Sequence, residues 1–362
     1  MRKIPLTIML IALLIGVIHS SVRATTDTPA AKDTATPTAT TTATVGKIYL
    51  PAILMQQPHW NPVADPQIPF AGFTKFFDTA ACGSHFFGGT NEGLYRLDPA
   101  QRKWVKVTGN DFPGDLVVAG VAFRDNKCDT VYAAARGKGL WRGKKAGGNN
   151  WAWDRVDAAA VTDDQARYVL VAGSELYLAG DFGVRRATIP ANAAASYAWQ
   201  DTNLTTLVTT ISDNDGRLLA AVWNDGVYEW NGQTFVKLPG ILPDTQVYTA
   251  SAIGGNYIAG AQTGLMRAAL AVDWYLVRSG VPAETTYATL AHKGVFLIGQ
   301  RHEDAFRSDD DGKTWKPLPA FPSIRPDGDQ GFQVRGFDVG LTDGRLYAAT
   351  TSGVWQLVDT SP

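Results

Sequence analysis

The chain has 362 residues, of which 45% are hydrophobic and 19% charged, and its formal net charge is −1. A balance this close to neutral argues against nucleic acid or an anionic membrane surface as a partner. The sequence contains no H-E-x-x-H, C-x-x-C, G-x-S-x-G or phosphate-binding glycine loop, so zinc, serine-hydrolase and nucleotide chemistry lack support. We therefore expect no metal and no cofactor.

Three segments precede the part of the chain that we expect to fold. Two basic residues stand before an apolar stretch at residues 6–18 and small residues follow, which predicts a secretory signal peptide over residues 1–24. An uncleaved anchor is the alternative, although the stretch is short for a span of about 20 residues. Residues 25–46, rich in Thr, Ala and Pro, are expected to form a disordered linker, and residues 47–57 an apolar connection. These features predict a secreted or cell-surface protein with no membrane span after cleavage.

From residue 58 onward, one pattern occurs seven times. Small and apolar residues lead to a glycine, once an alanine, and an apolar–aromatic strand follows; these pivot residues are Gly93, Gly139, Gly183, Gly226, Gly264, Ala305 and Gly353, spaced 38 to 48 residues apart. A period in the forties, with short strands and glycine-rich turns, is typical of a β-propeller. An aromatic residue after each of the first six pivots marks a fourth strand: Trp104, Trp153, Trp199, Phe235, Trp274 and Trp315.

The seventh pivot, Gly353, has no such aromatic residue after Trp355, whereas an unmatched one, Trp60, precedes the first repeat. We infer that the N-terminal strand around Trp60 completes the last blade, which removes two open sheet edges. The prediction is an all-β fold, a seven-bladed β-propeller of four-stranded antiparallel blades over residues 58–362. Six or eight blades are the alternatives, because an Ala-rich insertion displaces Trp199.

The two cysteines, Cys82 and Cys128, lie 46 residues apart, which equals the first interval between pivots. They should therefore occupy the same turn in neighbouring blades, where equivalent positions lie close together. In an exported protein, an even pair at such positions favours a disulfide over two free thiols. The bond would need Cα atoms about 4.4–6.8 Å apart.

One short motif, residues 308–315, fits the pattern S-x-D-x-G-x-T-W through Ser308, Asp310, Gly312, Thr314 and Trp315. Its serine and aspartate can bond to turn amides, its glycine supplies a positive φ, and its tryptophan can pack under the hairpin. The motif resembles the Asp-box, or BNR repeat, of sialidase-like propellers in the wider WD40/YVTN-like group. In that family the box joins the third and fourth strands on the rim, away from the catalytic face. The resemblance thus implies a structural role for these residues.

Propeller ligands usually meet the face made by the loops between second and third strands and between blades. One such loop loses the pivot glycine and concentrates four ionisable residues, which are Arg301, His302, Glu303 and Asp304. We expect a ligand to bind there, helped by Trp223 in an equivalent loop and by Arg325 in the longest interblade loop. The alternative is a solvated turn.

No catalytic constellation is assembled in the sequence. The Arg-Ile-Pro element, the arginine triad and the Tyr–Glu pair that a sialidase would need cannot be identified. We therefore expect a monomeric, non-catalytic binding or scaffold module that recognises an extracellular protein or a glycan. The alternative is a glycan-active enzyme, a glycoside hydrolase of the sialidase-like type, which would use two carboxylates about 5–9 Å apart. A propeller similar to photosystem assembly factors is a third interpretation, which the dispersed arginines and the net charge of −1 disfavour.

Overall fold

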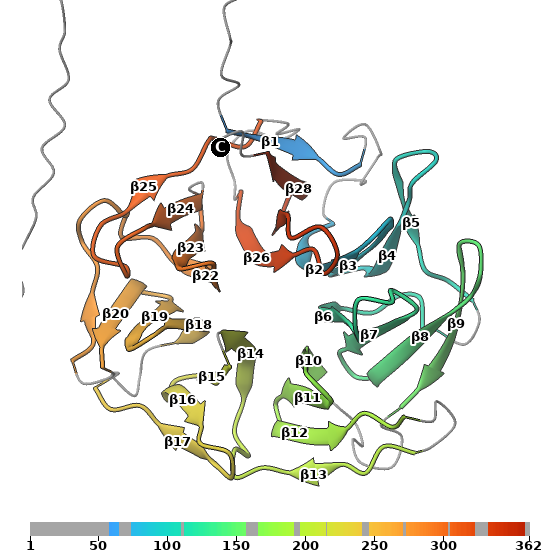
Figure 1. The fold of residues 1–362 in the computed structure, drawn as a ribbon, viewed down its shortest axis with the longest axis horizontal. Helices are drawn as coiled ribbons and strands as arrows, with labels where there is room; N and C mark the ends of the chain where they lie inside the picture. The colour runs from blue at the N-terminus through green and yellow to red at the C-terminus, as the bar shows by residue number, and fades with distance from the viewer. Residues whose placement is uncertain are drawn as a thin grey trace, which may run out of the picture. The chain divides into compact units, whose positions relative to one another are not determined.

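The computed structural model describes residues 58–64, 74–109, 112–156, 166–191, 196–214, 216–240, 246–270, 273–302, 305–322 and 332–358. In these ranges the regular structure consists of strands alone. They form seven sheets of four antiparallel strands arranged around an axis (Figure 1). The seven-bladed, all-β prediction is confirmed, and six or eight blades are wrong. The predicted signal peptide, linker and apolar connection all lie outside the described residues.

Each blade is built outward from the axis (Figure 1). The innermost strands are β2 (Phe76–Cys82), β6 (Val118–Phe123), β10 (Ala166–Ala172), β14 (Val208–Asn214), β18 (Val247–Ile253), β22 (Thr286–His292) and β26 (Val334–Val339). The second strands are β3 (His85–Thr90), β7 (Thr130–Ala135), β11 (Glu175–Gly180), β15 (Arg217–Val222), β19 (Asn256–Ala261), β23 (Val295–Gln300) and β27 (Leu346–Thr350). We number the blades 1 to 7 from β2 to β26.

The third strands are β4 (Gly93–Asp98), β8 (Gly139–Gly147), β12 (Gly183–Thr188), β16 (Gly226–Trp230), β20 (Gly264–Ala269), β24 (Ala305–Ser308) and β28 (Gly353–Val358). Every one of them begins at a pivot residue of the sequence repeat. The outermost strands are β5 (Lys103–Lys106), β9 (Asn150–Arg155), β13 (Gln200–Asp201), β17 (Phe235–Lys237), β21 (Tyr275–Leu276), β25 (Lys316–Pro317) and β1 (His59–Pro62). The pivot Gly183 shows why glycine recurs: its φ is +94°, and an added Cβ would lie 1.9 Å from the Leu204 carbonyl oxygen.

The ring closes as the sequence predicts. Strand β1 pairs antiparallel with β28, so that Trp60 lies opposite Leu357. The Trp60 side chain is only 2% exposed. Its Nε1 donates to the Pro319 carbonyl oxygen at 2.9 Å, and its ring stacks on Phe321 with centroids 4.4 Å apart. The two ends of the propeller are therefore joined by backbone pairing and by a buried aromatic anchor.

Apolar packing between blades forms the core. Strand β7 is buried along its whole length, and its three alanines allow neighbouring sheets to approach closely. Each buried Val, Leu or Phe side chain contributes about 1.5–3 kcal/mol relative to exposure. Clusters such as Phe87, Phe123 and Trp153 span blades 1 and 2. The stability of each blade therefore depends on its two neighbours.

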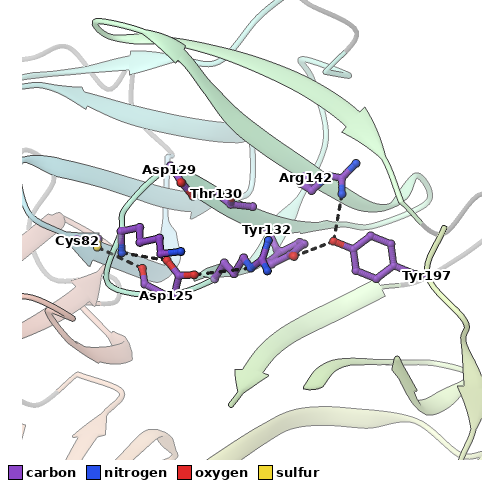
Figure 2. Close-up of polar contacts among 9 residues, drawn as sticks. Cys82, Asp125, Asp129, Thr130, Tyr132, Arg142 and Tyr197 are labelled. Atoms are coloured by element: carbon purple, nitrogen blue, oxygen red, sulfur yellow. Dashed lines mark hydrogen bonds and ion pairs between the residues drawn. The ribbon is translucent and has the colours of Figure 1, made fainter. Parts of the chain in front are cut away.

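A covalent link also joins blades 1 and 2. Cys82, at the end of β2, and Cys128, in the turn between β6 and β7, form a disulfide with Cα atoms 5.4 Å apart. The Cys82 sulfur lies 3.6 Å from the Asp125 carbonyl oxygen in the same turn (Figure 2). Closing a loop of this length stabilises a fold by about 4 kcal/mol in the chain-entropy picture.

The residues of the S-x-D-x-G-x-T-W motif form the turn between β24 and β25. Ser308 Oγ accepts the Gly312 N–H at 2.9 Å and donates to Asp310 Oδ1 at 2.8 Å. The Asp310 carboxylate accepts the backbone N–H and the hydroxyl of Thr314, at 2.8 and 2.7 Å. These bonds from Thr314 lower the pKa of Asp310 to about 2. Trp315 Nε1 donates to the Gly312 carbonyl oxygen at 3.1 Å, so the side chains of Ser308, Asp310, Thr314 and Trp315 all bond within the turn.

Candidate functional site

A β-bulge follows the first residue of every innermost strand. The strand register shifts at the second residue in all seven sheets. A bulge bends its strand and redirects a side chain. The seven bulged residues, which we call the bulge ring, are Phe77, Ala119, Arg167, Thr209, Tyr248, Tyr287 and Arg335. All seven line one cavity of about 250 Å³, which we call the mouth cavity.

A second cavity, of about 370 Å³, is lined by later residues of the same strands. The two cavities share Asp78 and Tyr168 among their lining residues. They are therefore two parts of one channel that follows the axis, and the bulge ring forms one of its mouths. Strand starts and the loops after the second strands meet at this mouth, which is the face that the sequence analysis selected for ligands.

One side of the mouth carries a continuous arc of aromatic rings and one arginine. Tyr248 and Tyr287, from neighbouring blades, have ring centroids 5.0 Å apart, and Trp223 packs edge-on against Tyr248 at 5.5 Å. The Arg335 guanidinium lies 3.9 Å from the Tyr287 centroid and 5.7 Å from that of Phe77. We call these five residues the aromatic arc. Cation–π contacts of this kind hold a guanidinium in place while leaving its N–H groups to other acceptors.

Arg335 has no ionic partner among the described residues. Its Nε is buried and makes no hydrogen bond, although an arginine carries five N–H donors and no acceptor. Burial lowers the pKa of the Arg335 guanidinium, while Tyr287 and Tyr248 act in the opposite direction. A buried donor without an acceptor costs about 1–3 kcal/mol. The arc therefore presents an unsatisfied positive charge to the mouth cavity.

The arginine of the bulge ring on the opposite side of the mouth, Arg167, is paired with a carboxylate. Arg167 Nε lies 2.6 Å from Asp181 Oδ1. Burial lowers the pKa of the neighbouring Arg136, and the charge of Arg167 acts in the same direction. Because Arg167 is paired, the uncompensated charge of the bulge ring is concentrated at Arg335.

Two buried carboxyl groups lie deeper in the channel. Asp78 Oδ2 accepts the Val121 N–H of the next blade at 2.9 Å, and Asp338 Oδ2 accepts the Ala81 N–H at 2.9 Å. Burial, more than any other influence, raises the pKa of Asp78 to about 8 and that of Asp338 to about 7. The nearby Asp78 carboxyl, followed by burial, raises the pKa of the Tyr168 hydroxyl well above its usual value. At neutral pH the folded protein therefore holds Asp78 largely protonated.

Hydroxyl groups make comparable bonds between other innermost strands. Thr210 Oγ1 donates to the Tyr248 carbonyl oxygen at 3.0 Å, and Ser212 Oγ donates to that of Ala250 at 2.7 Å. The Thr249 and Thr289 hydroxyls lie 2.8 Å apart. A polar side chain that bonds to the next blade is thus a recurring device of the channel wall. Asp78 and Asp338 perform the same task with carboxyl groups.

The structure brings one predicted ligand residue to the mouth cavity, Trp223. Arg301 and His302 are exposed and lie in the loop between β23 and β24. Their backbone N–H groups bond to the carbonyl oxygens of Thr285 and Phe332, both at 2.8 Å, and His302 Nδ1 lies 3.8 Å from a Glu284 carboxylate oxygen. Neither side chain lines the mouth cavity. The remaining predicted ligand residues, Glu303, Asp304 and Arg325, lie outside the described residues.

Sequence reasoning missed Arg335, Tyr287, Asp78 and Asp338. A signal does exist for Asp78, because it is the one charged residue in the strand F-F-D-T-A-A-C. Asp338 shares its strand, V-R-G-F-D-V, with Arg335, so charge does not single out either residue. No comparable signal marks Arg335 or Tyr287. Their place in the ring depends on bulges that only the pairing of whole strands reveals.

No family model matches the chain, and no curated protein matches it. Among solved structures, it is similar to the extracellular domain of a hybrid two-component system from B. thetaiotaomicron, with 10% identity and a TM-score of 0.61, over 83% of this chain and 39% of that one. It is also similar to a structure from the same organism that is described as the extracellular domain of a one-component system. The identity is 11% and the TM-score 0.61, over 84% of this chain and 40% of that one. For the WD40 β-propeller domain of Doa1, the identity is 12% and the TM-score 0.55, over 79% of this chain and 93% of that one.

These similarities show the fold alone, because all three identities are low. The chain spans about two fifths of the length of the two bacterial domains. Two of the three structures are extracellular domains of bacterial signalling systems, and the third is a WD40 propeller. The chain therefore shares the architecture of a β-propeller that occurs both in bacterial extracellular domains and in WD40 proteins.

Proposed function

We propose that the protein is an exported, non-catalytic binding propeller that receives an acidic group of a protein or glycan in the mouth cavity. The observation that carries the proposal is the guanidinium of Arg335, held between aromatic rings with no ionic partner among the described residues. An acidic group would satisfy its free donors, and charge-assisted bonds of this kind are about twice as strong as neutral ones.

The size of the mouth cavity supports a projecting group rather than a whole ligand. Its volume of about 250 Å³ is slightly smaller than the usual range of about 300–1,000 Å³ for ligand pockets. One amino-acid side chain or one acidic sugar fits such a volume. The planar rings of Tyr248 and Tyr287 would pack against the apolar surface of that group, as aromatic side chains commonly do in binding sites.

The exported location has two kinds of support. The N-terminal pattern predicts a signal peptide, and two similar solved structures are extracellular domains of bacterial signalling systems. Among the described residues, no helix is long and apolar enough to cross a membrane.

The glycoside hydrolase alternative would place Asp78 and Asp338 in catalytic roles. Their bonds to the backbone of the next blade instead favour a structural role. Purified protein should show no turnover on a panel of aryl-glycosides and polysaccharides. Turnover that is abolished by Asp78→Asn or Asp338→Asn would support the enzyme and contradict the binding module.

Ligands can be sought on a glycan array and on an array of acidic and neutral peptides. We expect the wild-type protein to bind acidic members, and Arg335→Leu to weaken binding at least tenfold without lowering the melting temperature. Arg185→Leu is the control, because Arg185 pairs with Asp201 outside the channel. Unchanged binding by Arg335→Leu would show the proposed site to be wrong.

The same arrays test the loop chosen from the sequence. The triple substitution of Arg301, His302 and Glu303 by alanine should weaken binding if that loop contacts the ligand. If the triple variant binds normally while Arg335→Leu does not, the ligand contacts the aromatic arc and not the loop.

A further inference from the structure

A separate cavity of about 240 Å³ lies between blades 1 and 2, away from the channel. We call it the rim cavity. Its polar lining comes from Arg96 on β4, Lys106 on β5, Thr108 after β5, and Asn149 and Asn150 at the β8–β9 turn. Figure 1 shows β5, β8 and β9 on the outer side of the ring.

The β8–β9 hairpin creates this cavity. Strand β8 has nine residues and is the longest of the third strands. Trp151 and Trp153 of β9 pack edge-on against Phe87 of blade 1, with ring centroids 5.0 and 6.0 Å apart. The hairpin is therefore fixed against blade 1 by buried rings, and the rim cavity is a built part of the interface between the two blades.

The Arg96 side chain has no ionic or hydrogen-bond partner among the described residues. Its Nη1 atom is buried and makes no hydrogen bond. Arg96 lies on β4 opposite Phe87 of β3 and Val105 of β5, so neither cross-strand neighbour offers a side-chain acceptor. A half-buried guanidinium in this state is costly to the fold unless something else accepts its hydrogen bonds.

The repeat itself supplies a comparison. Arg142 and Arg267 stand three residues after their pivot glycines, as Arg96 does. Arg142 lies opposite Asp154 of the outermost strand, to which it is ion-paired. It also donates to the Tyr197 hydroxyl at 3.3 Å (Figure 2).

Arg267 is satisfied in a similar way. It lies opposite Tyr275 of the outermost strand and donates to that hydroxyl at 2.7 Å. Its Nη2 donates to Asn256 Oδ1 at 2.9 Å, and its Nε to the Asp311 carbonyl oxygen at 2.8 Å. In blade 1 the position of Asp154 and Tyr275 is taken by Val105, whose side chain cannot accept a hydrogen bond. Arg96 thus keeps the arginine of the repeat but lacks its acceptor.

The surroundings of Arg96 are basic rather than acidic. His85, on the neighbouring strand β3, lies with its Nε2 atom 3.0 Å from Lys145 Nζ. Burial lowers the pKa of His85, and the charges of Lys145 and Arg96 add to this effect. Lys106 is paired with Asp115 at 2.5 Å. The positive charge at Arg96 and Lys145 has no paired carboxylate in the described part of blades 1 and 2.

We infer that the rim cavity is an anion-binding site for a sulfate or phosphate group, with Arg96 as the main ligand. A guanidinium binds such oxyanions through two parallel N–H···O bonds. Asn149, Asn150 and Thr108 also line the cavity, and their side chains carry hydrogen-bond donors that the oxygens of such an anion can accept. The site is independent of the mouth cavity and of the function proposed for it.

The test compares melting temperatures of the full chain in sodium sulfate, sodium phosphate and a sulfated disaccharide, each against sodium chloride of equal ionic strength. At least one of the three should raise the melting temperature of the wild-type protein above its value in chloride, and the rise should saturate with increasing concentration. A response to the inorganic ions alone identifies free anions as the ligand, and a tighter response to the disaccharide identifies a sulfated glycan. No response to any of the three would overturn the inference.

Substitution locates the response. Arg96→Met should abolish it and should leave stability in chloride unchanged or slightly higher, because it removes an unsatisfied buried donor. Arg267→Met is the matched control: it should lower stability in chloride, since it breaks three internal bonds, and should keep the sulfate response. An Arg96→Met protein that responds like the wild type, or an Arg267→Met protein that loses the response equally, would contradict the site.

Discussion

The buried carboxyl group of Asp78 predicts how the stability of the fold depends on pH. Asp78 is 4% exposed, and burial raises its pKa from 3.8 to about 8. In the folded state the proton stays bound up to about pH 8, whereas the unfolded chain releases it near pH 4. The proton therefore stabilises the fold, and this contribution is lost as the pH rises between these two values.

The magnitude follows from the two pKa values. Where the folded state holds one more proton than the unfolded chain, the free energy of unfolding falls by about 1.4 kcal/mol per pH unit. From about pH 5 to pH 7, Asp78 alone lowers it by about 3 kcal/mol. Asp338, whose pKa is raised to about 7, adds a contribution of the same sign over a slightly narrower range.

The perturbation is Asp78→Asn. In the wild-type protein Asp78 Oδ2 accepts a hydrogen bond from the Val121 N–H. The side-chain oxygen of an asparagine can accept the same bond, and the asparagine carries no charge at any pH. We expect little change in stability near pH 5. Near pH 8 the variant should be more stable than the wild-type protein, because it avoids a buried charge, and its stability should fall less steeply with pH.

The assay is urea unfolding followed by tryptophan fluorescence at a series of pH values from about 4 to 9. Asp310→Asn is the control, because hydrogen bonds lower the pKa of Asp310 to about 2. The stability that Asp310 contributes is lost only as the pH falls from about 4 toward 2, so between pH 5 and 9 this variant should keep the pH dependence of the wild-type protein. A wild-type stability that is flat from pH 5 to 8, or an Asp78→Asn variant that is less stable at pH 8, would refute the reasoning.

Two further predictions concern the ring itself. In urea unfolding, Gly183→Ala should lower the free energy of unfolding by at least about 2 kcal/mol more than Gly353→Ala does. Both positions have positive φ, but an added Cβ lies 1.9 Å from the Leu204 carbonyl oxygen at Gly183 and meets nothing within 4 Å at Gly353. Equal losses of stability in the two variants would contradict this packing. Trp60→Ala should cost about 3–5 kcal/mol, because it removes the stack on Phe321. It should also promote association in size-exclusion chromatography by weakening β1 and exposing a sheet edge; a stable, strictly monomeric variant would argue against closure through β1.

The candidate sites were only partly predictable. The sequence selected the face on which the mouth cavity opens and one residue that lines it, Trp223, since a tryptophan in a loop after a second strand is conspicuous. Arg335 looked like any other charged residue near a strand start. Its role became visible only when the bulge in β26 placed it against Tyr287 of blade 6. These two side chains come from separate blades, and a periodic pattern in the sequence does not specify which side chains of separate repeats meet.

What the sequence determined by itself was the number of blades, the start of each third strand and the closure through Trp60. These features depend on local requirements that recur, namely a glycine where φ is positive and an aromatic residue on the outer strand. The tertiary structure alone decided which of the repeated polar positions are satisfied. Arg142 and Arg96 occupy equivalent positions, yet one lies opposite a carboxylate and the other opposite Val105. Burial and the absence of a nearby acceptor, which arise only when strands and blades pack together, turn an ordinary arginine into a candidate ligand.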